Sequence, residues 1–188
     1  MCGRYTLFTE EEYRDIRQII QEAQNKAHGA PIRTGEIYPT NLAPILVGER
    51  GSVGAEAAVW GFPNYRGRGV LINARSETAA EKPTFRKLLH GSRCVVPSTG
   101  FYEWTAEKEK VRFNLPETGE LYMAGLCREE EGERRYVVLT TAANASVSPV
   151  HDRMPVLIPK EGIEEWILRA DSIERFFGSL QPALRMEK

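Results

Sequence analysis

Short apolar segments separated by turn residues fill most of the chain after residue 40, and this pattern constrains the fold most strongly. Within residues 53–60, apolar side chains stand at every second position, which is typical of a strand with one buried face. The turn sequence of residues 116–119 predicts a hairpin between its flanking strands, and the Gly- and Arg-rich stretch 65–69 is predicted to be a loop. Alternation and short apolar runs together predict strands at residues 44–47, 53–60, 70–72, 94–97, 111–115, 121–124, 136–139 and 156–158.

Helical periodicity is confined to a few segments. Apolar residues recur at helical spacing after Thr9, and Thr9 with Glu12 predicts a capping box at the start of a helix over residues 10–24. Many strands with scattered helices indicate an α+β domain, and the strands are too numerous for one flat sheet. We therefore predict a single domain over residues 1–188 with a mixed, mostly antiparallel, barrel-like β-sheet and flanking helices. The remaining helices are predicted at residues 82–90, 162–169 and 172–177.

Composition argues against several classes of protein. No apolar run is long enough to cross a membrane, and the N-terminus lacks the charged and apolar regions of a signal peptide, so we expect a cytoplasmic protein without membrane contact. The net charge of −1 argues against coating of duplex DNA by bulk charge, but it is compatible with a local cleft lined by arginines. The three cysteines and three histidines show no metal-ligand spacing, so neither a metal nor a cofactor is predicted. Cys94 and Cys127 lie in apolar runs and are predicted to be core residues.

Cys2 becomes the N-terminal residue when methionine aminopeptidase removes Met1, which it does when the next side chain is small. The residue then carries a free α-amine with a pKa of about 7.7–8.0 and a thiol with a pKa of about 8.5. The amine condenses with an aldehyde to an imine, and the thiolate of the same residue closes a thiazolidine ring in an intramolecular step. An internal cysteine lacks the free amine for this reaction. The alternative is an incidental cysteine at position 2.

Two titratable side chains are candidates for proton transfer. Glu103 lies between Tyr102 and Trp104, and aromatic neighbours that desolvate a carboxyl raise its pKa toward neutrality. His151 begins a polar triplet before Met154, and a histidine acts as an acid or a base near neutral pH. The alternatives are a surface glutamate in an aromatic strand and a structural histidine.

Polar and aromatic side chains in the same segments are candidates for binding a sugar-phosphate chain. Asn73 and Arg75 share one face if their segment is extended, and an amide and a guanidinium suit a sugar oxygen and a phosphate. The rings of Trp60 and Trp104 are candidates for stacking on splayed bases, although Trp60 is also a candidate core residue. The alternative for Asn73 and Arg75 is a hydrogen-bonding pair at the end of a strand.

Taken together, these segments resemble the SOS-response-associated peptidase (SRAP) family, the abasic-site processing proteins. Each motif is weakly specific by itself, whereas the ordered set is highly specific and covers most of the chain. The motifs are Met1-Cys2-Gly3-Arg4-Tyr5, Asn41-Leu42-Ala43-Pro44, Trp60-Gly61, Ile72-Asn73-Ala74-Arg75-Ser76-Glu77-Thr78, Gly100-Phe101-Tyr102-Glu103-Trp104, Leu139-Thr140-Thr141-Ala142-Ala143 and His151-Asp152-Arg153-Met154-Pro155.

The resemblance implies that the partner is an abasic site in single-stranded DNA or at a junction of single and double strands. It implies that Cys2 forms a thiazolidine with the aldehyde of the ring-opened sugar, which protects the lesion from strand cleavage and error-prone bypass. By matching positions, Asn73 orients the opened sugar, Glu103 manages protons during imine formation and ring closure, and His151 acts as an acid or base at the sugar. The family is also associated with removal of the residues before its cysteine, and we expect self-processing and lyase activity as further possibilities.

The resemblance also implies a DNA-binding surface. Arg4, Arg75 and Arg153 are expected to hold the phosphates that flank the lesion, and Trp60 and Trp104 to wall the site or stack on bases. A monomer is expected. Family members usually continue past the last helix into a further strand and tail, so a chain that ends at residue 188 is expected to be short at one sheet edge.

Three other functions remain open on the sequence. Class II glutamine amidotransferases also expose an N-terminal cysteine, but none of their downstream glutamine-binding motifs is found here. A non-catalytic module that binds single-stranded DNA would keep the arginines and aromatic residues and dispense with Cys2. A cysteine peptidase acting on other proteins would use Cys2, His151 and Glu103, although no segment indicates a peptide-binding pocket.

Overall fold

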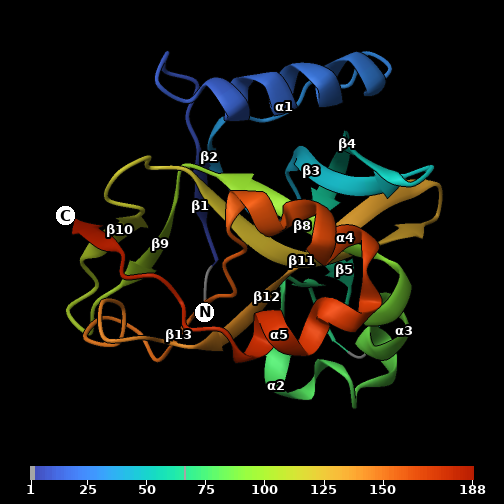
Figure 1. Ribbon diagram of the computed structural model, residues 1–188. Helices are drawn as coiled ribbons and strands as arrows, with labels where there is room; N and C mark the ends of the chain where they lie inside the picture. The colour runs from blue at the N-terminus through green and yellow to red at the C-terminus, as the bar shows by residue number, and fades with distance from the viewer. Residues whose placement is uncertain (1–2, 66) are drawn as a thin grey trace.

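The computed structural model describes residues 3–65 and 67–188, so Cys2 lies outside the described residues. The strands form two main sheets and a small two-stranded ribbon, and helices pack around them (Figure 1). The prediction of an α+β fold with a barrel-like, mostly antiparallel sheet and flanking helices is confirmed. Among the described residues, no helix combines the length and the apolar character that a membrane span requires.

The larger sheet closes on itself to form a barrel. Strand β11 pairs with both β8 and β12, β12 pairs with β4, and β3 lies between β4 and β8, so the ladder returns to its first strand. These pairs are antiparallel except for β4 with β12. The closed ring leaves its own strands without an open edge. Its strands are β3 (Leu42–Glu49), β4 (Ser52–Trp60), β8 (Arg93–Ser98), β11 (Leu121–Glu130) and β12 (Glu133–Ala142).

Strand β12 continues beyond the ring, and two short strands pair with its second half. Strand β7 (Asn73–Arg75) runs parallel to it on one side, and β13 (Arg153–Pro155) runs antiparallel on the other. Thr140 of β12 is the partner of Arg75 in one pair and of Pro155 in the other. The segments that carry Asn73 and His151 are therefore held on opposite sides of one strand.

The second sheet is antiparallel and contacts the barrel through β1. Its order is β14 (Arg185–Glu187), β10 (Lys110–Asn114), β9 (Gly100–Trp104), β1 (Tyr5–Leu7) and β2 (Gly35–Ile37). The hydroxyls of Tyr5 and Tyr136 lie 2.6 Å apart, and the Tyr5 ring meets the edge of Trp60 at 5.2 Å between centroids. All three rings are fully buried, so they join the first strand of the chain to β4 and β12.

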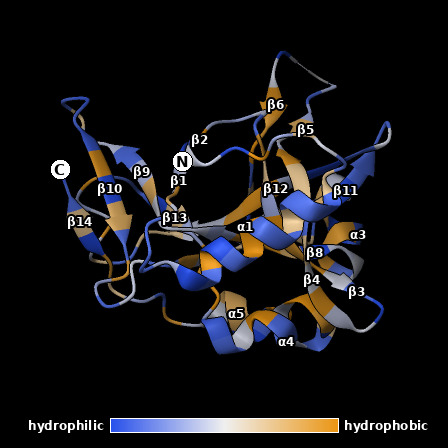
Figure 2. Ribbon diagram, turned by 90° about the horizontal axis from the view of Figure 1, so that it is seen from above, coloured by the Kyte–Doolittle hydropathy of each residue, from blue (hydrophilic) through white to orange (hydrophobic). Residues whose placement is uncertain are grey.

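The helices and the ribbon complete the fold. Helix α1 (Arg14–Lys26) lies across β3 and β4 and buries Ile16 and Ala23 (Figure 1). The ribbon of β5 (Phe62–Pro63) and β6 (Val70–Leu71) projects from the molecule, away from β10 and β14 (Figure 2). The predicted loop 65–69 falls between these two strands in the sequence, and residue 66 lies outside the described residues. The other helices are α2 (Ser76–Ala79), α3 (Pro83–Gly91), α4 (Ile163–Leu168) and α5 (Ile173–Gly178), with short 3-10 helices at Lys160–Gly162 and Ala170–Ser172.

The predicted hairpin between residues 111–115 and 121–124 is wrong. Strand β10 pairs with β9 and β14, whereas β11 pairs with β8 and β12. The turn between them carries the chain from the second sheet to the barrel. Alternating side chains identify a strand and its buried face, but many strands offer the same pattern and compete as partners.

Three element boundaries also differ from the predictions. Helix α1 begins at Arg14, after a turn in which the Tyr13 amide donates to the Glu10 carbonyl at 3.1 Å. Its N-cap is Tyr13 without a side-chain cap, so the predicted capping box of Thr9 and Glu12 is wrong. The strand predicted at 156–158 lies a few residues earlier in the chain, as β13. Within the predicted range, Leu157 makes only an isolated bridge to Met123. The strand predicted at 70–72 ends at Leu71 in the ribbon.

Candidate functional site

Glu103 and His151 face each other between the two sheets, and both side chains are able to exchange a proton. Oε2 of Glu103 lies 3.9 Å from Nε2 of His151, and the Glu103 side chain is only 4% exposed. On β9, Glu103 shares the buried face with Phe101, whereas Tyr102 and Trp104 point to the other face. Burial raises the pKa of Glu103, and the nearby His151 acts in the opposite direction. The expected desolvation is present, but it comes from the core beneath β9 and not from the two flanking aromatic residues.

A backbone contact fixes the orientation of the His151 ring. The amide of Arg153 donates to Nδ1 of His151 at 3.0 Å, so Nδ1 is an acceptor and the neutral ring carries its proton on Nε2, facing Glu103. Asp152 Oδ1 also lies 3.0 Å from Nδ1, and this contact is favourable only when Nδ1 carries a proton. The Asp152 side chain is 85% exposed, whereas the Arg153 amide is held in the backbone. The backbone contact therefore determines which nitrogen of the neutral His151 ring carries the proton.

Asn73 and Arg75 occupy neighbouring positions on one face of β7. Asn73 is half-buried, Arg75 is exposed, and the intervening Ala74 is buried. Their strand partners on β12 are Val138 and Thr140. Within the part of the chain that the structure describes, no hydrogen bond or ion pair is found for the Arg75 side chain. An exposed guanidinium beside a half-buried amide fits the predicted contacts to a phosphate and a sugar.

Arg4 lies near the start of the described chain, next to the strand that carries Glu103. Its carbonyl accepts the amide of Tyr102 at 2.9 Å. Its guanidinium carbon lies 4.3 Å from the ring centroid of Tyr38 and 5.1 Å from that of Trp104. Nη1 also contacts Glu36 at 3.2 Å. Arg4 and Trp104 therefore form a half-exposed cationic and aromatic surface on the face of β9 opposite Glu103, and such a surface suits a contact with DNA.

Arg153 is more enclosed than the predicted phosphate contact implies. Its side chain is 11% exposed, and it donates from Nη1 and Nη2 to the two carboxylate oxygens of Glu77 at 2.7 and 2.8 Å. Nη2 also donates to the Thr140 carbonyl at 2.7 Å. This two-point contact lowers the pKa of Glu77 to about 2.

The structure corrects the expectation that Trp60 stacks on a base. Its ring is fully buried between Tyr5 and Tyr136, and Nε1 donates to the carbonyl of Ile72 at 3.1 Å. Trp60 is therefore a core residue behind the site. Phe101 is fully buried as well.

Sequence reasoning missed Glu77 and Glu36, the acidic partners of the two arginines. Glu77 lies inside the motif of residues 72–78, but nothing in one sequence pairs it with Arg153, which is far along the chain. A search for acidic residues within the same motifs as the basic ones would have found Glu77. No comparable signal marks Glu36, because it lies outside those motifs.

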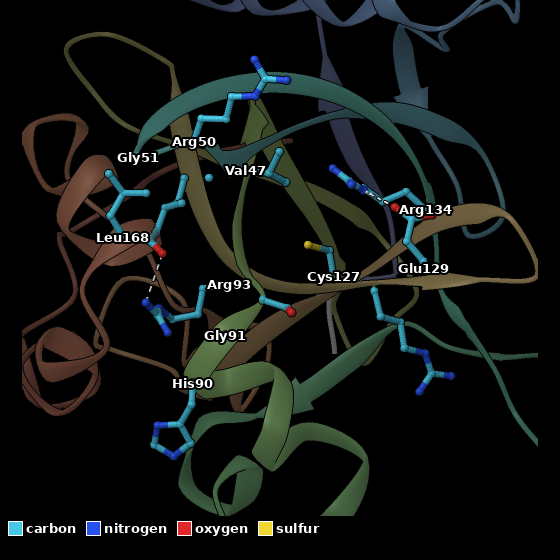
Figure 3. A pocket seen from close by; sticks show the side chains of 14 residues that line it. Val47, Arg50, Gly51, His90, Gly91, Arg93, Cys127, Glu129, Arg134 and Leu168 are labelled. Carbon is cyan, nitrogen blue, oxygen red and sulfur yellow. Dashed lines mark hydrogen bonds and ion pairs between the residues drawn. The ribbon is translucent and has the colours of Figure 1, made fainter.

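A separate cavity of about 400 Å³ opens between the β3–β4 hairpin, the end of α3 and the β11–β12 hairpin (Figure 3). Two of its arginines already have partners: Arg93 donates to the carbonyls of Leu89 and Ile167 at 2.7 and 3.1 Å, and Arg134 to Glu129 at 2.7 Å. Cys127 lines this cavity and is buried, as predicted, together with Cys94. None of the predicted site residues lines it.

The fold and the site define a class of proteins with a closed β-barrel, an attached antiparallel sheet, and a buried carboxyl that faces a histidine where the two sheets meet. The chain belongs to the family described as "SOS response associated peptidase (SRAP)", whose family model matches residues 1–186. The resemblance inferred from the ordered motifs is therefore confirmed.

Several proteins that are similar to this chain are named abasic site processing proteins. "Abasic site processing protein YoqW" of Bacillus subtilis is 32% identical over 181 residues, covering 89% of this chain and 80% of that protein. "Abasic site processing protein YedK" of Escherichia coli is 29% identical over 182 residues, covering 89% and 79%. A crystal structure of a Bacteroides thetaiotaomicron protein shares the fold, with a TM-score of 0.77 and 20% identity over 98% of this chain and 90% of that one.

Proposed function

We propose that this protein captures abasic sites in single-stranded DNA through a covalent thiazolidine bond to Cys2, once Met1 has been removed. The names of its relatives and the family match support an abasic site as the target. The observation that carries the proposal is the buried Glu103 facing His151, next to the strand that follows Cys2. Such a pair is the acid–base machinery that an imine-forming cysteine requires.

The reaction needs no group beyond the protein and the DNA. The α-amine of Cys2 adds to the aldehyde carbon of the ring-opened sugar, and the resulting carbinolamine loses one water to give an imine. The Cys2 thiol then adds across the C=N bond, with sulfur on carbon and the proton on nitrogen, and closes the thiazolidine. The ring closure is intramolecular, so its effective concentration is high.

Glu103 and His151 supply and accept the protons. A buried carboxyl with a raised pKa retains its proton closer to neutrality, so Glu103 protonates the leaving hydroxyl as water forms. His151 presents Nε2–H toward the same place and donates to an oxygen of the opened sugar. The amide of Asn73, on the neighbouring β7, holds a sugar hydroxyl.

The arginines and Trp104 bind the strand on either side of the lesion. Arg75 offers an exposed guanidinium to a phosphate, and Arg4, which directly precedes β1 and accepts the Tyr102 amide on its carbonyl, offers a second one. Arg153 keeps a second hydrogen on Nη1 that the Glu77 contact does not use. Trp104 is half-exposed and offers part of its ring to a neighbouring base.

The test is a denaturing gel of the protein mixed with a single-stranded oligonucleotide that carries one abasic site. Wild-type protein should give a band that survives denaturation, and Cys2→Ala should give none while still binding undamaged single strands. Cys127→Ala is the matched control, because its thiol is internal and its variant should crosslink normally. A persistent band with Cys2→Ala would contradict the proposal and leave a different nucleophile to be found.

This gel, together with a glutaminase assay, distinguishes the alternatives. A non-catalytic DNA-binding module gives no denaturation-resistant band with either protein. An N-terminal-cysteine amidohydrolase releases glutamate from glutamine, and a peptidase or lyase activity appears as cleaved protein or cleaved oligonucleotide on the same gel.

A further inference from the structure

Glu77 and Arg153 join the two segments that carry the candidate catalytic side chains. Glu77 belongs to α2, directly after the strand of Asn73 and Arg75. Arg153 begins β13, directly after the turn of His151. Their two hydrogen bonds, at 2.7 and 2.8 Å, form a bidentate ion pair with fixed geometry. The pair therefore links the His151 turn to the β7–α2 segment across β12.

Arg153 transmits this link to the His151 ring. Its Nη2 is attached to the Thr140 carbonyl of β12 at 2.7 Å, so the guanidinium has contacts to both neighbouring elements. Its backbone amide donates to Nδ1 of His151 at 3.0 Å. A change in the position of Arg153 therefore moves the donor that sets both the orientation and the protonated nitrogen of the ring.

We propose that Glu77 is a positioning residue, which holds Arg153 and through it keeps the His151 ring aligned with Glu103 and Asn73 for DNA capture. This inference rests on the proposed function of the same site. Glu77 itself is 46% exposed and touches neither Glu103 nor His151 in the contacts described above, so its effect on the reaction passes through Arg153. A displacement of about 1 Å at a reacting group is enough to slow a reaction by up to about a hundredfold.

Charge distinguishes positioning from DNA binding. Replacing Glu77 by Gln removes a negative charge next to Arg153 and leaves the guanidinium in place. The attraction of this region for phosphates therefore stays the same or increases. If Glu77 is a positioning residue, the same variant should form the covalent bond more slowly. A neutral amide has only one acceptor oxygen and is unable to form the bidentate contact with Arg153.

The experiment compares Glu77→Gln, Glu77→Asp and the exposed control Glu81→Gln with wild type. Two quantities are measured: the first-order rate of crosslink formation at saturating abasic oligonucleotide, and the Kd for the undamaged oligonucleotide of the same sequence. We expect Glu77→Gln to slow crosslinking by about tenfold or more and to leave the Kd equal or lower. Glu77→Asp, which keeps the charge and both oxygens, should recover part of the rate, and Glu81→Gln should behave as wild type.

The outcomes are separable. If wild type forms no crosslink, the proposed function fails and the positioning role fails with it. If wild type crosslinks and Glu77→Gln does so at an unchanged rate, only the positioning role is overturned. A Glu77→Gln variant that loses rate and affinity in parallel, with no recovery in Glu77→Asp, also overturns it, because the residue is then merely structural.

Discussion

Nε2 of His151 lies 3.9 Å from Oε2 of Glu103, at the boundary between a half-exposed ring and a carboxyl that is 4% exposed. This distance is longer than a hydrogen bond, so the two groups face each other without a direct hydrogen bond between these two atoms. A reacting oxygen that lies to one side of the line joining these two atoms reaches hydrogen-bond distance of both.

Glu103→Gln should make the folded protein more stable near neutral pH. Burial raises the pKa of Glu103 above its ordinary value of 4.5, so the folded state binds this proton more tightly than the unfolded chain. Its contribution is fully present below pH 4.5 and is lost as the pH rises through the raised pKa. The free energy of unfolding, measured in urea from pH 4.5 to neutrality, should therefore fall less in Glu103→Gln than in wild type. Parallel curves for the two proteins would contradict the raised pKa.

Glu77→Gln should change how the free energy of unfolding depends on pH below 4.5. Arg153 lowers the pKa of Glu77 from 4.5 to about 2, so the ionised carboxylate stabilises the fold above pH 4.5 and this contribution is lost as the pH falls toward 2. The variant should lose less stability than wild type over that interval, and solvent exposure of Glu77 keeps the difference small. Glu81→Gln is the control, and urea unfolding at low salt is the measurement. An acid limb identical in wild type and Glu77→Gln would show that the ion pair has no effect on stability.

Arg75→Ala should weaken binding of all single-stranded sequences alike. Its guanidinium is exposed and lies beside Asn73, and the proposed function assigns it to a phosphate, which carries no base code. The slope of log K against log salt should fall by about 0.7, the value for one phosphate contact on a single strand. Arg169→Ala, which removes an exposed arginine paired with Asp171, is the control. Weakening that depends on the base sequence would assign Arg75 to a base instead.

The two tryptophans should separate into a binding residue and a core residue. Trp104 is half-exposed, and its replacement by Ala should weaken DNA binding by about 1–3 kcal/mol with little loss of stability. Trp60 is fully buried, and its replacement should destabilise the fold by about 3–5 kcal/mol. Thermal unfolding and fluorescence anisotropy with an oligonucleotide measure the two effects. A Trp104→Ala variant that unfolds early and binds normally would reverse the assignment.

The positions of the strands can be predicted from the sequence more reliably than the pairing of one strand with another. Residues 53–60 and 94–97 were predictable as strands because period-two and apolar-run patterns reflect the local pleat, and both are confirmed as β4 and β8. The partners of β10 were not, because pairing depends on which of several similar strands closes the sheet. The pairing of β11 with β12, which closes the barrel, likewise depends on all five strands of the ring and not on a local pattern.

The same contrast holds at the site. Glu103 and His151 were identifiable as candidates from their residue types and motifs, and the fold brings them to 3.9 Å across a separation that no local pattern encodes. The hydrogen bond from the Arg153 amide to His151 and the ion pair of Arg153 with Glu77 could not be predicted in this way. Both depend on how the folded backbone places residues relative to one another. Trp60 shows the converse, since an aromatic residue in a functional motif turned out to fill the core.

Mass spectrometry of the purified crosslink tests the central claim most directly. The account predicts that Met1 is absent, that the adduct mass equals the protein plus the abasic oligonucleotide minus one water, and that fragmentation places the DNA on Cys2. It also predicts an adduct that borohydride leaves unreduced, since a closed thiazolidine has no C=N bond. An adduct formed by protein that retains Met1, or attached to another residue, would contradict it.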